Sequence, residues 1–182
     1  MNPSAMLSLL LLLLLAGRQA AAGETTLNSM CNFLGGDYVN YDYCVSTLSS
    51  DPVSATADGH TLALIAVNLT AANATAVRSL ADSLSVSASS DSFVRASLQN
   101  CSSLYAASSP DLLRSFAAAA ARNYTAATTA LSSVLRVPAG CDEAFAAAKE
   151  GAAVASPIRT ENNAFSDLAT LAKAVNNYLA SD

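Results

Sequence analysis

The sequence contains no tryptophan, a single histidine and few charged residues. Only 13% of its 182 residues are charged, and 14 acidic against 9 basic side chains give a net charge of −5. Because there is no basic excess to neutralise phosphates, we expect no nucleic-acid partner. Seven glycines and five prolines are too few for a collagen-like or proline-rich stalk.

Most catalytic chemistry is also missing. Acid–base catalysis near neutral pH usually draws on histidine, and we interpret His60, beside Gly59, as a solvated residue near a helix start. The sequence has no G-x-S-x-G, H-E-x-x-H or glycine-rich phosphate motif. The neighbours Asp142 and Glu143 would diverge on a helix, so we interpret them as charges at a helix N-terminus. We therefore expect no enzyme, no catalytic, cofactor-binding or metal-binding residues, and no cofactor.

What the chain has in abundance is alanine. There are 39 alanines, and 52% of the residues are hydrophobic although only 6% are aromatic. Such a composition predicts a thin core with closely spaced backbones. The length suits one domain, which would bury roughly two-thirds of the surface of its unfolded chain.

The N-terminus is typical of a secretory signal peptide. Residues 6–16 are leucine-rich and apolar apart from Ser8, and at 1.5 Å per residue they span about 17 Å as a helix, short of the roughly 30 Å hydrocarbon layer. Small residues at Ala20 and Ala22 fit a cleavage site. We predict a signal peptide at 1–22 and a mature domain at 23–182 which, without Arg18, has a net charge of −6. An uncleaved anchor is the alternative, and we expect no later stretch to cross a membrane.

The four cysteines fit an exported protein. An even number in such a chain favours disulfides, and three pairings are open, of which Cys31 with Cys44 and Cys101 with Cys141 is the simplest. These two bridges would contribute about 3 and 4 kcal/mol through loop entropy. A zinc site is the alternative, but there is no C-x2-C pair to support it.

Apolar periodicity predicts helices almost throughout. Residues 57–87 form one long helix, with an expected buried stripe of Leu62, Ala66, Leu69, Ala76, Leu80 and Leu84. A second helix follows Asp91, and Pro110 should either kink it near Ala106 or start a new helix capped by Ser109. A third helix should run through Tyr124, Ala127, Leu131 and Val134 and break at residues 137–140, after which residues 141–150 should be helical again. The closing helix should bury a seam of Phe165, Leu168, Ala172, Val175 and Leu179.

These segments predict an all-α protein. Four amphipathic helices joined by short connections favour an antiparallel up-and-down four-helix bundle at residues 53–182. Residues 23–52 differ, with Gly35 and Gly36 between two cysteines and a cluster of Tyr38, Tyr41 and Tyr43, and we predict a helical hairpin there tied by Cys31 and Cys44.

Four N-x-S/T sequons indicate glycosylation. Asn73 falls on the expected buried stripe and is an unlikely acceptor. We predict glycans on Asn68, which lies off the stripe, and on Asn123, which lies at a turn. We also predict one on Asn100, although it precedes a cysteine whose oxidation could compete with modification.

The motifs together resemble the plant invertase and pectin methylesterase inhibitor family. The cysteine pattern C-x12-C-x3-L-x2-D-P begins at Cys31. The later marks are LQNC at 98–101, LY at 104–105, CDEAF at 141–145 and SP at 156–157. The resemblance covers residues 27–179, and the segments 39–44 and 160–162 are most similar to the branch of tree-pollen allergens described as invertase inhibitors.

The resemblance implies both a fold and a role. It implies a four-helix bundle with an N-terminal helical hairpin, disulfides pairing the first cysteine with the second and the third with the fourth, and secretion to the apoplast and cell wall. There the protein would inhibit pectin methylesterase or acid invertase by covering the active-site cleft without covalent chemistry. An acidic chain is compatible with a basic enzyme partner. The alternatives are a non-inhibitory secreted interaction protein and a helical small-molecule carrier, which would need a cavity.

The resemblance also indicates where contact residues would lie. Invertase inhibitors of the family tend to carry Pro-Lys-Phe near the third bundle helix, where this chain has RNY at 122–124. We predict partner contacts by an outward cluster of Arg122, Tyr124 and Thr128. The alternative is an ordinary helix start with Tyr124 packed inward. Two departures from the family, Pro110 and extra residues before Cys141 that include Pro138 and Gly140, lie on helices expected to meet the enzyme.

Overall fold

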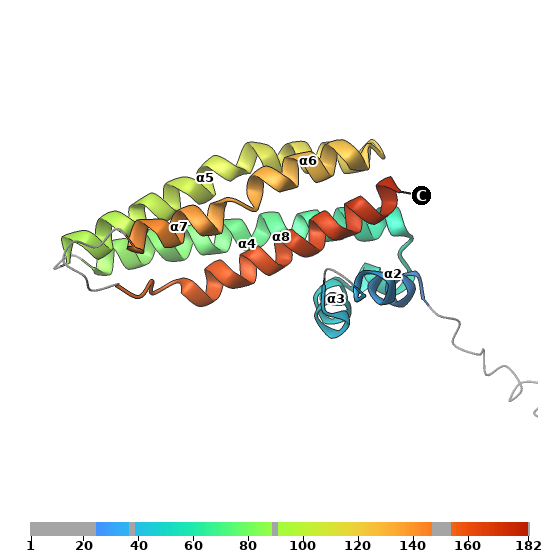
Figure 1. Cartoon of the computed structure of the whole chain (residues 1–182), viewed down its shortest axis with the longest axis horizontal. Helices are drawn as coiled ribbons and strands as arrows, with labels where there is room; N and C mark the ends of the chain where they lie inside the picture. Colours follow the sequence, from blue (N-terminus) through green and yellow to red (C-terminus); the bar gives the residue numbers. More distant parts are fainter. Residues whose placement is uncertain (1–24, 37–38, 89–90, 147–153, 182) are drawn as a thin grey trace, which may run out of the picture.

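The computed structural model describes residues 25–36, 39–88, 91–146 and 154–181, and over these residues the chain is all-helical (Figure 1). The predicted signal peptide, Tyr38 and the end of the expected segment 141–150 lie outside the described residues. The helices are α2 (Thr26–Leu34), α3 (Tyr41–Leu48), the 3-10 helix η1 (Pro52–Thr56), α4 (Gly59–Ser87), α5 (Ser92–Ala120), α6 (Tyr124–Val134), α7 (Val137–Ala146) and α8 (Arg159–Ala180).

Side-chain caps fix where most of these helices begin. A helix leaves its first backbone N–H groups without partners, and a short polar side chain placed just before it can accept from them. Asp58 Oδ1 accepts from the Thr61 N–H at 2.8 Å, and Asp91 Oδ1 accepts from Phe93 and Val94 at 3.0 Å. The remaining caps are Thr25 for α2, Asn40 for α3, Asp51 for η1 and Asn123 for α6.

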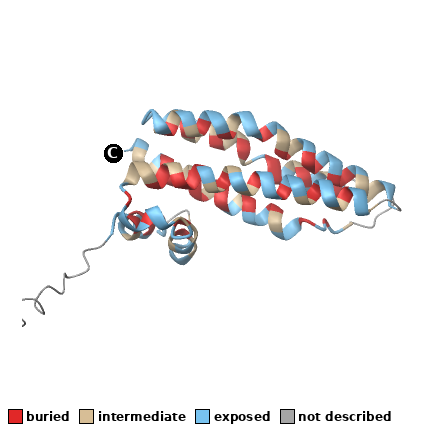
Figure 2. Ribbon diagram, turned by 180° about the vertical axis from the view of Figure 1, so that it is seen from behind, coloured by how far each residue is buried: buried red, intermediate tan, exposed pale blue. Residues whose placement is uncertain are grey.

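The long helices make the predicted four-helix bundle. α4 packs against α5 and α8, and α6 packs against the same two helices, so that α6 followed by α7 forms the fourth column (Figure 1). Buried residues face the interior of the bundle along its whole length (Figure 2). The all-α class is confirmed, and it follows from the 3.6-residue periodicity of the apolar side chains.

The buried stripe of α4 is only partly the predicted one. Leu62 and Ala66 are buried, but Ala76 is exposed and the leucines farther along lie at the margin of the core. The stripe continues instead through Thr70, Ala74, Val77, Ala81 and Ser85. Small residues occupy these positions because the backbones of α4, α5 and α8 approach closely, and larger leucines fit only at the flanks.

α4 also corrects the expectation that no later stretch could cross a membrane. By length and composition alone Gly59–Ser87 is long and apolar enough to do so. Core helices of bundles meet the same criterion, and the interior face of α4 is packed against α5 and α8.

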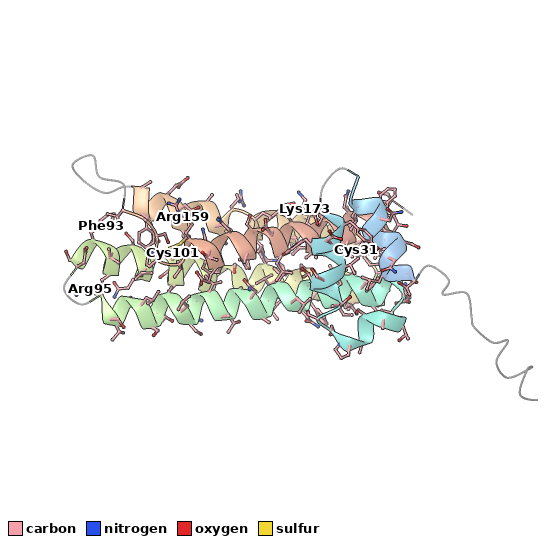
Figure 3. The ribbon with its side chains drawn as sticks, turned by 90° about the horizontal axis from the view of Figure 1, so that it is seen from below. Cys31, Phe93, Arg95, Cys101, Arg159 and Lys173 are labelled. Atoms are coloured by element: carbon pink, nitrogen blue, oxygen red, sulfur yellow. A yellow bond between two sulfur atoms is a disulfide. The ribbon has the colours of Figure 1, made fainter. Side chains whose placement is uncertain are left out.

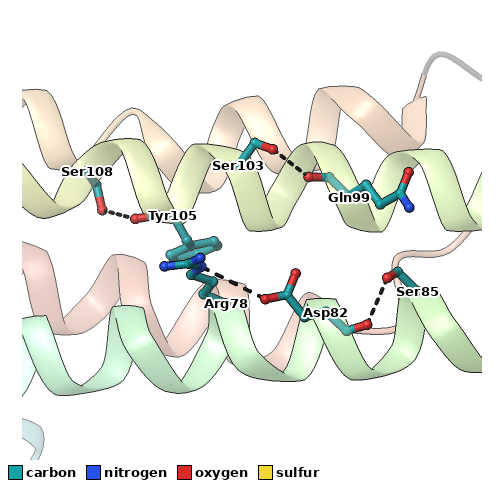
Figure 4. A network of polar contacts seen from close by, with 7 residues as sticks. All are labelled: Arg78, Asp82, Ser85, Gln99, Ser103, Tyr105 and Ser108. Atoms are coloured by element: carbon teal, nitrogen blue, oxygen red, sulfur yellow. Dashed lines mark hydrogen bonds and ion pairs between the residues drawn. The ribbon is translucent and has the colours of Figure 1, made fainter.

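Pro110 does not interrupt α5. The helix runs through it from Ser92 to Ala120, so the expected new start capped by Ser109 is wrong. Proline removes one backbone hydrogen bond and crowds the preceding turn. Two residues before Pro110, the Ser108 hydroxyl donates to the Tyr105 carbonyl at 2.7 Å. One turn earlier along α5, the Ser103 hydroxyl donates to the Gln99 carbonyl (Figure 4). Packing of α5 against α4 and α6 on either side keeps the helix continuous.

The break between α6 and α7 lies earlier than predicted. α6 ends at Val134 and α7 begins at Val137, so Pro138 and Gly140 belong to the first turns of α7 rather than to a break. Proline is tolerated there because the first turn of a helix needs no partner for its N–H. A Cβ on Gly140 would come within 3.2 Å of Leu104 Cδ1, so glycine permits close packing of α7 on α5.

A buried polar network joins α5, α7 and α8. The Tyr105 hydroxyl donates to Asn162 Oδ1 at 2.7 Å, and Asn162 Nδ2 donates to the Pro138 carbonyl and to Asp142 Oδ1, each at 2.9 Å. Because α7 starts at Val137, Asp142 belongs to this network and does not serve a helix N-terminus as predicted. Burial, and then the Asp142 carboxylate, raise the pKa of Tyr105 well above its usual value near 10.

The two expected disulfides are present. Cys31–Cys44 joins α2 to α3, and Cys101–Cys141 joins α5 to α7, with all four cysteines fully buried. The hairpin of α2 and α3 lies beside one end of the bundle (Figure 1). Met30 Cε and Leu179 Cδ2 lie 3.4 and 2.9 Å from the place of a Cβ on Gly59, so this glycine lets the hairpin and the end of α8 close over the start of α4.

Candidate functional site

Four polar residues gather where the first residues of α4 meet the turn between α5 and α6. We call Asp58, His60, Arg122 and Tyr124 the turn cluster. Asp58 and His60 flank the first residue of α4, while Arg122 and Tyr124 flank the cap of α6. The antiparallel bundle brings these two chain segments together although more than sixty residues separate them.

Arg122 is held in a left-handed backbone conformation. Its φ is 57°, and it is the only non-glycine residue with a positive φ in the described part of the chain. The Arg122 N–H bonds to the Ala119 carbonyl and the Asn123 N–H to the Ala118 carbonyl, both at 2.8 Å. This pattern is a Schellman motif, whose left-handed position normally carries glycine. An exposed arginine there carries strain that a structural turn does not need.

His60 is not the solvated residue that the sequence suggested. It is half-buried, and its Nδ1 lies 3.1 Å from the Tyr124 hydroxyl, with the two rings packed edge to face. The correction has a tertiary cause, because Tyr124 comes from a different helix. His60 therefore fixes the position of the Tyr124 hydroxyl at the surface.

Asp58 supplies an exposed negative charge next to Arg122. Hydrogen bonds from the side chain and backbone of Thr61 lower its pKa, and the charges of His60 and Arg122 act in the same direction. The carboxylate therefore stays ionised at mildly acidic pH. The turn cluster thus exposes one acidic and one basic group beside an aromatic ring.

The predicted contact residues do not all face outward. Arg122 is exposed, but Tyr124 is half-buried and packs against the core, as the inward alternative proposed. Thr128, one turn later, has a buried hydroxyl without a hydrogen-bond partner in the described structure. The outward cluster therefore reduces to Arg122 and the exposed part of the half-buried Tyr124, while the Thr128 hydroxyl is buried.

The sequons divide by exposure. Asn68, Asn100 and Asn123 are exposed, whereas Asn73 is half-buried and its Oδ1 is buried without a partner among the described atoms. Asn123 Oδ1 accepts from the Ala126 N–H at 3.1 Å, which leaves its Nδ2 free to carry a glycan.

Sequence reasoning missed Asp58 and His60 as companions of Arg122. The helix-capping role of Asp58 was readable from its place before Gly59, but no local pattern connects His60 with Tyr124. Among the residues that the structure describes, no group of three or more His, Cys, Asp or Glu could hold a metal ion.

Solved structures with the same fold are plant inhibitors. The chain superposes on a mutant form of a pectin methylesterase inhibitor from Arabidopsis with a TM-score of 0.67 and 18% identity, covering 84% of this chain and 96% of that one. A second structure, a pectin methylesterase inhibitor from Arabidopsis thaliana, gives a TM-score of 0.59 and 18% identity over 84% of this chain and 95% of that one. At this identity the similarity shows the fold.

Sequence comparison gives the family. Two plane-tree proteins named "Putative invertase inhibitor", from Platanus acerifolia and Platanus orientalis, are each 28% identical over 141 residues, which cover 78% of this chain and 76% and 81% of theirs. The family model described as "Plant invertase/pectin methylesterase inhibitor" matches residues 25–178. With a helical bundle, two buried disulfides and a family match over most of its length, this chain belongs to the plant invertase/pectin methylesterase inhibitor family.

Proposed function

We propose that the protein is a secreted inhibitor of a plant cell-wall carbohydrate-active enzyme, either pectin methylesterase or acid invertase. It acts by non-covalent occlusion of the active-site cleft. Arg122 and the exposed edge of Tyr124 contact the enzyme, and Thr128 supports them from behind. The buried disulfides are consistent with the oxidising apoplast and cell wall, to which a signal peptide at 1–22 would deliver the chain.

The observation that carries this proposal is the left-handed Arg122. A strained non-glycine residue persists where its surroundings hold it and where its side chain has a use. Glycine would adopt the left-handed position of the Schellman motif without strain, so we infer that the Arg122 guanidinium serves binding and not the turn. The exposed guanidinium can pair with a carboxylate of the enzyme, as arginine does well at interfaces.

The test is inhibition of both enzymes by the disulfide-intact protein. We expect it to inhibit one of them at mildly acidic pH with a 1:1 stoichiometry. Arg122→Ala should weaken inhibition roughly tenfold if the contact is central. Arg78→Ala is the matched control, since Arg78 is an exposed arginine on α4 that pairs loosely with Asp82, and it should leave inhibition unchanged. No inhibition of either enzyme would contradict the proposal.

A specific observation favours a second function, that of a non-inhibitory interaction protein. The restart between α6 and α7 interrupts one of the columns that the family is expected to present to its target. This alternative predicts a folded protein with both disulfides and no complex with either enzyme in size-exclusion chromatography.

We also propose that Asn68, Asn100 and Asn123 carry glycans in the plant. All three are exposed, and a glycan on Asn123 would lie next to Arg122 and obstruct the proposed contact. Mass spectrometry before and after enzymatic deglycosylation tests occupancy. The inhibition assay on both forms tests whether the Asn123 glycan regulates binding.

A further inference from the structure

A mainly apolar groove lies between the N-terminal hairpin and the outer side of the bundle. Its volume is about 730 Å³, within the range of ligand pockets. Phe33 of α2 and Tyr178 of α8 form an aromatic wall. The apolar residues Leu34, Ala174 and Leu135, which we call the floor, also line the groove. The groove contains no residue of the turn cluster.

An aromatic wall of this groove is left open to solvent. The Phe33 ring is 68% exposed although its centroid lies 4.8 Å from that of Tyr178. Large apolar side chains are normally exposed singly, but here two rings in contact, tilted by 55°, stand beside an apolar floor. A flat or extended apolar group would cover the Phe33 ring and displace water from the floor.

One cation faces the same space. Lys173 of α8 lines the groove, and within the described residues it forms no ion pair. Among the described residues that line the groove there is no Asp or Glu. In a chain with a net charge of −5 and only two lysines, an unpaired ammonium over an apolar floor selects for a negative headgroup.

We propose that this groove binds a small amphipathic carboxylate, with the carboxylate on Lys173 and the apolar part on the Phe33–Tyr178 wall. The carrier role considered from the sequence needed a cavity, and the seam between the bundle helices is lined by small residues, many of them alanines. The groove lies outside that seam and uses the hairpin as its second wall. Binding here is separate from inhibition, because the two sites share no residue.

Calorimetric titration of the disulfide-intact protein tests the proposal with two probes, decanoate and 2-naphthoate. They share the carboxylate and differ in the apolar part, so the pair distinguishes an acyl ligand from an aromatic one. 1-Decanol and 2-naphthamide are the uncharged counterparts. Amide chemical shifts recorded in the same titrations locate the site.

We expect saturable 1:1 binding of at least one acid, with shifts centred on Ala174 and Tyr178. Lys173→Gln should weaken binding of that acid roughly three- to tenfold and leave the uncharged counterpart within a factor of about two. Phe33→Ala should weaken both, and because Phe33 is exposed the variant keeps the fold. Arg159→Gln removes a charge at the other end of α8, about 21 Å away along the helix, and should have no effect (Figure 3).

The proposal is overturned by any of three results. The first is the absence of saturable binding of either acid up to ~1 mM. The second is equal affinity of the wild type and Lys173→Gln for the acid. The third is a pattern of shifts away from α8 and the hairpin.

Discussion

The backbone of Arg122 makes a prediction that separates stability from inhibition. A left-handed conformation costs a non-glycine residue about 1–2 kcal/mol, because its Cβ crowds the following carbonyl. Arg122→Gly removes that strain at a φ of 57°. It also increases the freedom of the unfolded chain, which offsets about 0.5–1 kcal/mol of the gain. From the middle of these two ranges, the net expectation is a protein more stable by about 0.5–1 kcal/mol.

Thermal unfolding measures this difference. For a domain of this size 1 kcal/mol corresponds to about 2–4 °C, so Arg122→Gly should raise Tm by roughly 1–4 °C. Arg122→Ala keeps the strain and removes the guanidinium, and should unfold close to the wild type. Arg122→Val adds a β-branched side chain at a positive φ and should be the least stable of the series. Both Gly and Ala variants should lose inhibition to the same extent, because both lack the guanidinium.

The unfolding temperatures and the inhibition of these variants test both parts of the prediction. If the glycine variant unfolds at or below the temperature of the alanine variant, the turn is not strained at Arg122 and the argument from strain to function fails. If the glycine variant keeps full inhibition, the turn is strained but the guanidinium does not contact the enzyme.

The remaining predictions concern the core. Tyr105→Phe removes the 2.7 Å hydrogen bond to the buried Asn162 and should cost about 1–3 kcal/mol in urea unfolding, whereas a loss below about 0.5 kcal/mol would mean that the network is not structural. Burial raises the pKa of Tyr105, so above pH 10 the phenol ionises in the unfolded chain while it stays protonated in the folded protein. The free energy of unfolding should therefore be unaffected by this group below pH 10 and fall by about 1.4 kcal/mol per pH unit above it, a slope that Tyr105→Phe should lack. Pro110→Ala restores a helical N–H and should stabilise the protein by about 1–3 kcal/mol, and an unchanged midpoint in the same urea experiment would show that α5 already accommodates proline. Replacing Cys101 and Cys141 by serine opens a loop with a sequence separation of 40 and should cost about 4 kcal/mol, which differential scanning calorimetry would detect as a large drop in Tm unless the unfolded state is already compact.

Local signals were enough for the helices and for most of their starts. Asp58, Asp91 and Asn123 are short polar residues placed before apolar periodic segments, and each caps the helix that follows. The failures lie where a neighbour decides the outcome. Pro110 was expected either to kink the helix or to start a new one, and α5 runs through it without a new start. Pro138 was expected to break a helix and instead lies in the first turn of α7.

The candidate site was predictable only in part. Arg122 and Tyr124 stood out through the family motif, but the outward direction of Thr128 was wrong, because four residues beyond Tyr124 the same face of α6 turns toward the core. The bond between His60 and Tyr124 joins residues 64 positions apart, so no spacing in the sequence announces it.

The sequence by itself determined the helical class, the even set of cysteines and the sequons, because periodicity, composition and short motifs act within a few residues. Periodicity also placed most of the buried faces of α6 and α8 correctly. Only the tertiary structure decided which residues of α4 are buried beyond its first turns, how Tyr105, Asn162 and Asp142 share their hydrogen bonds, and that Arg122 adopts a left-handed turn near Asp58 and His60. These features depend on the close approach of alanine-rich backbones from distant parts of the chain. Such an approach fixes which side chains meet, and nothing local in the chain encodes it.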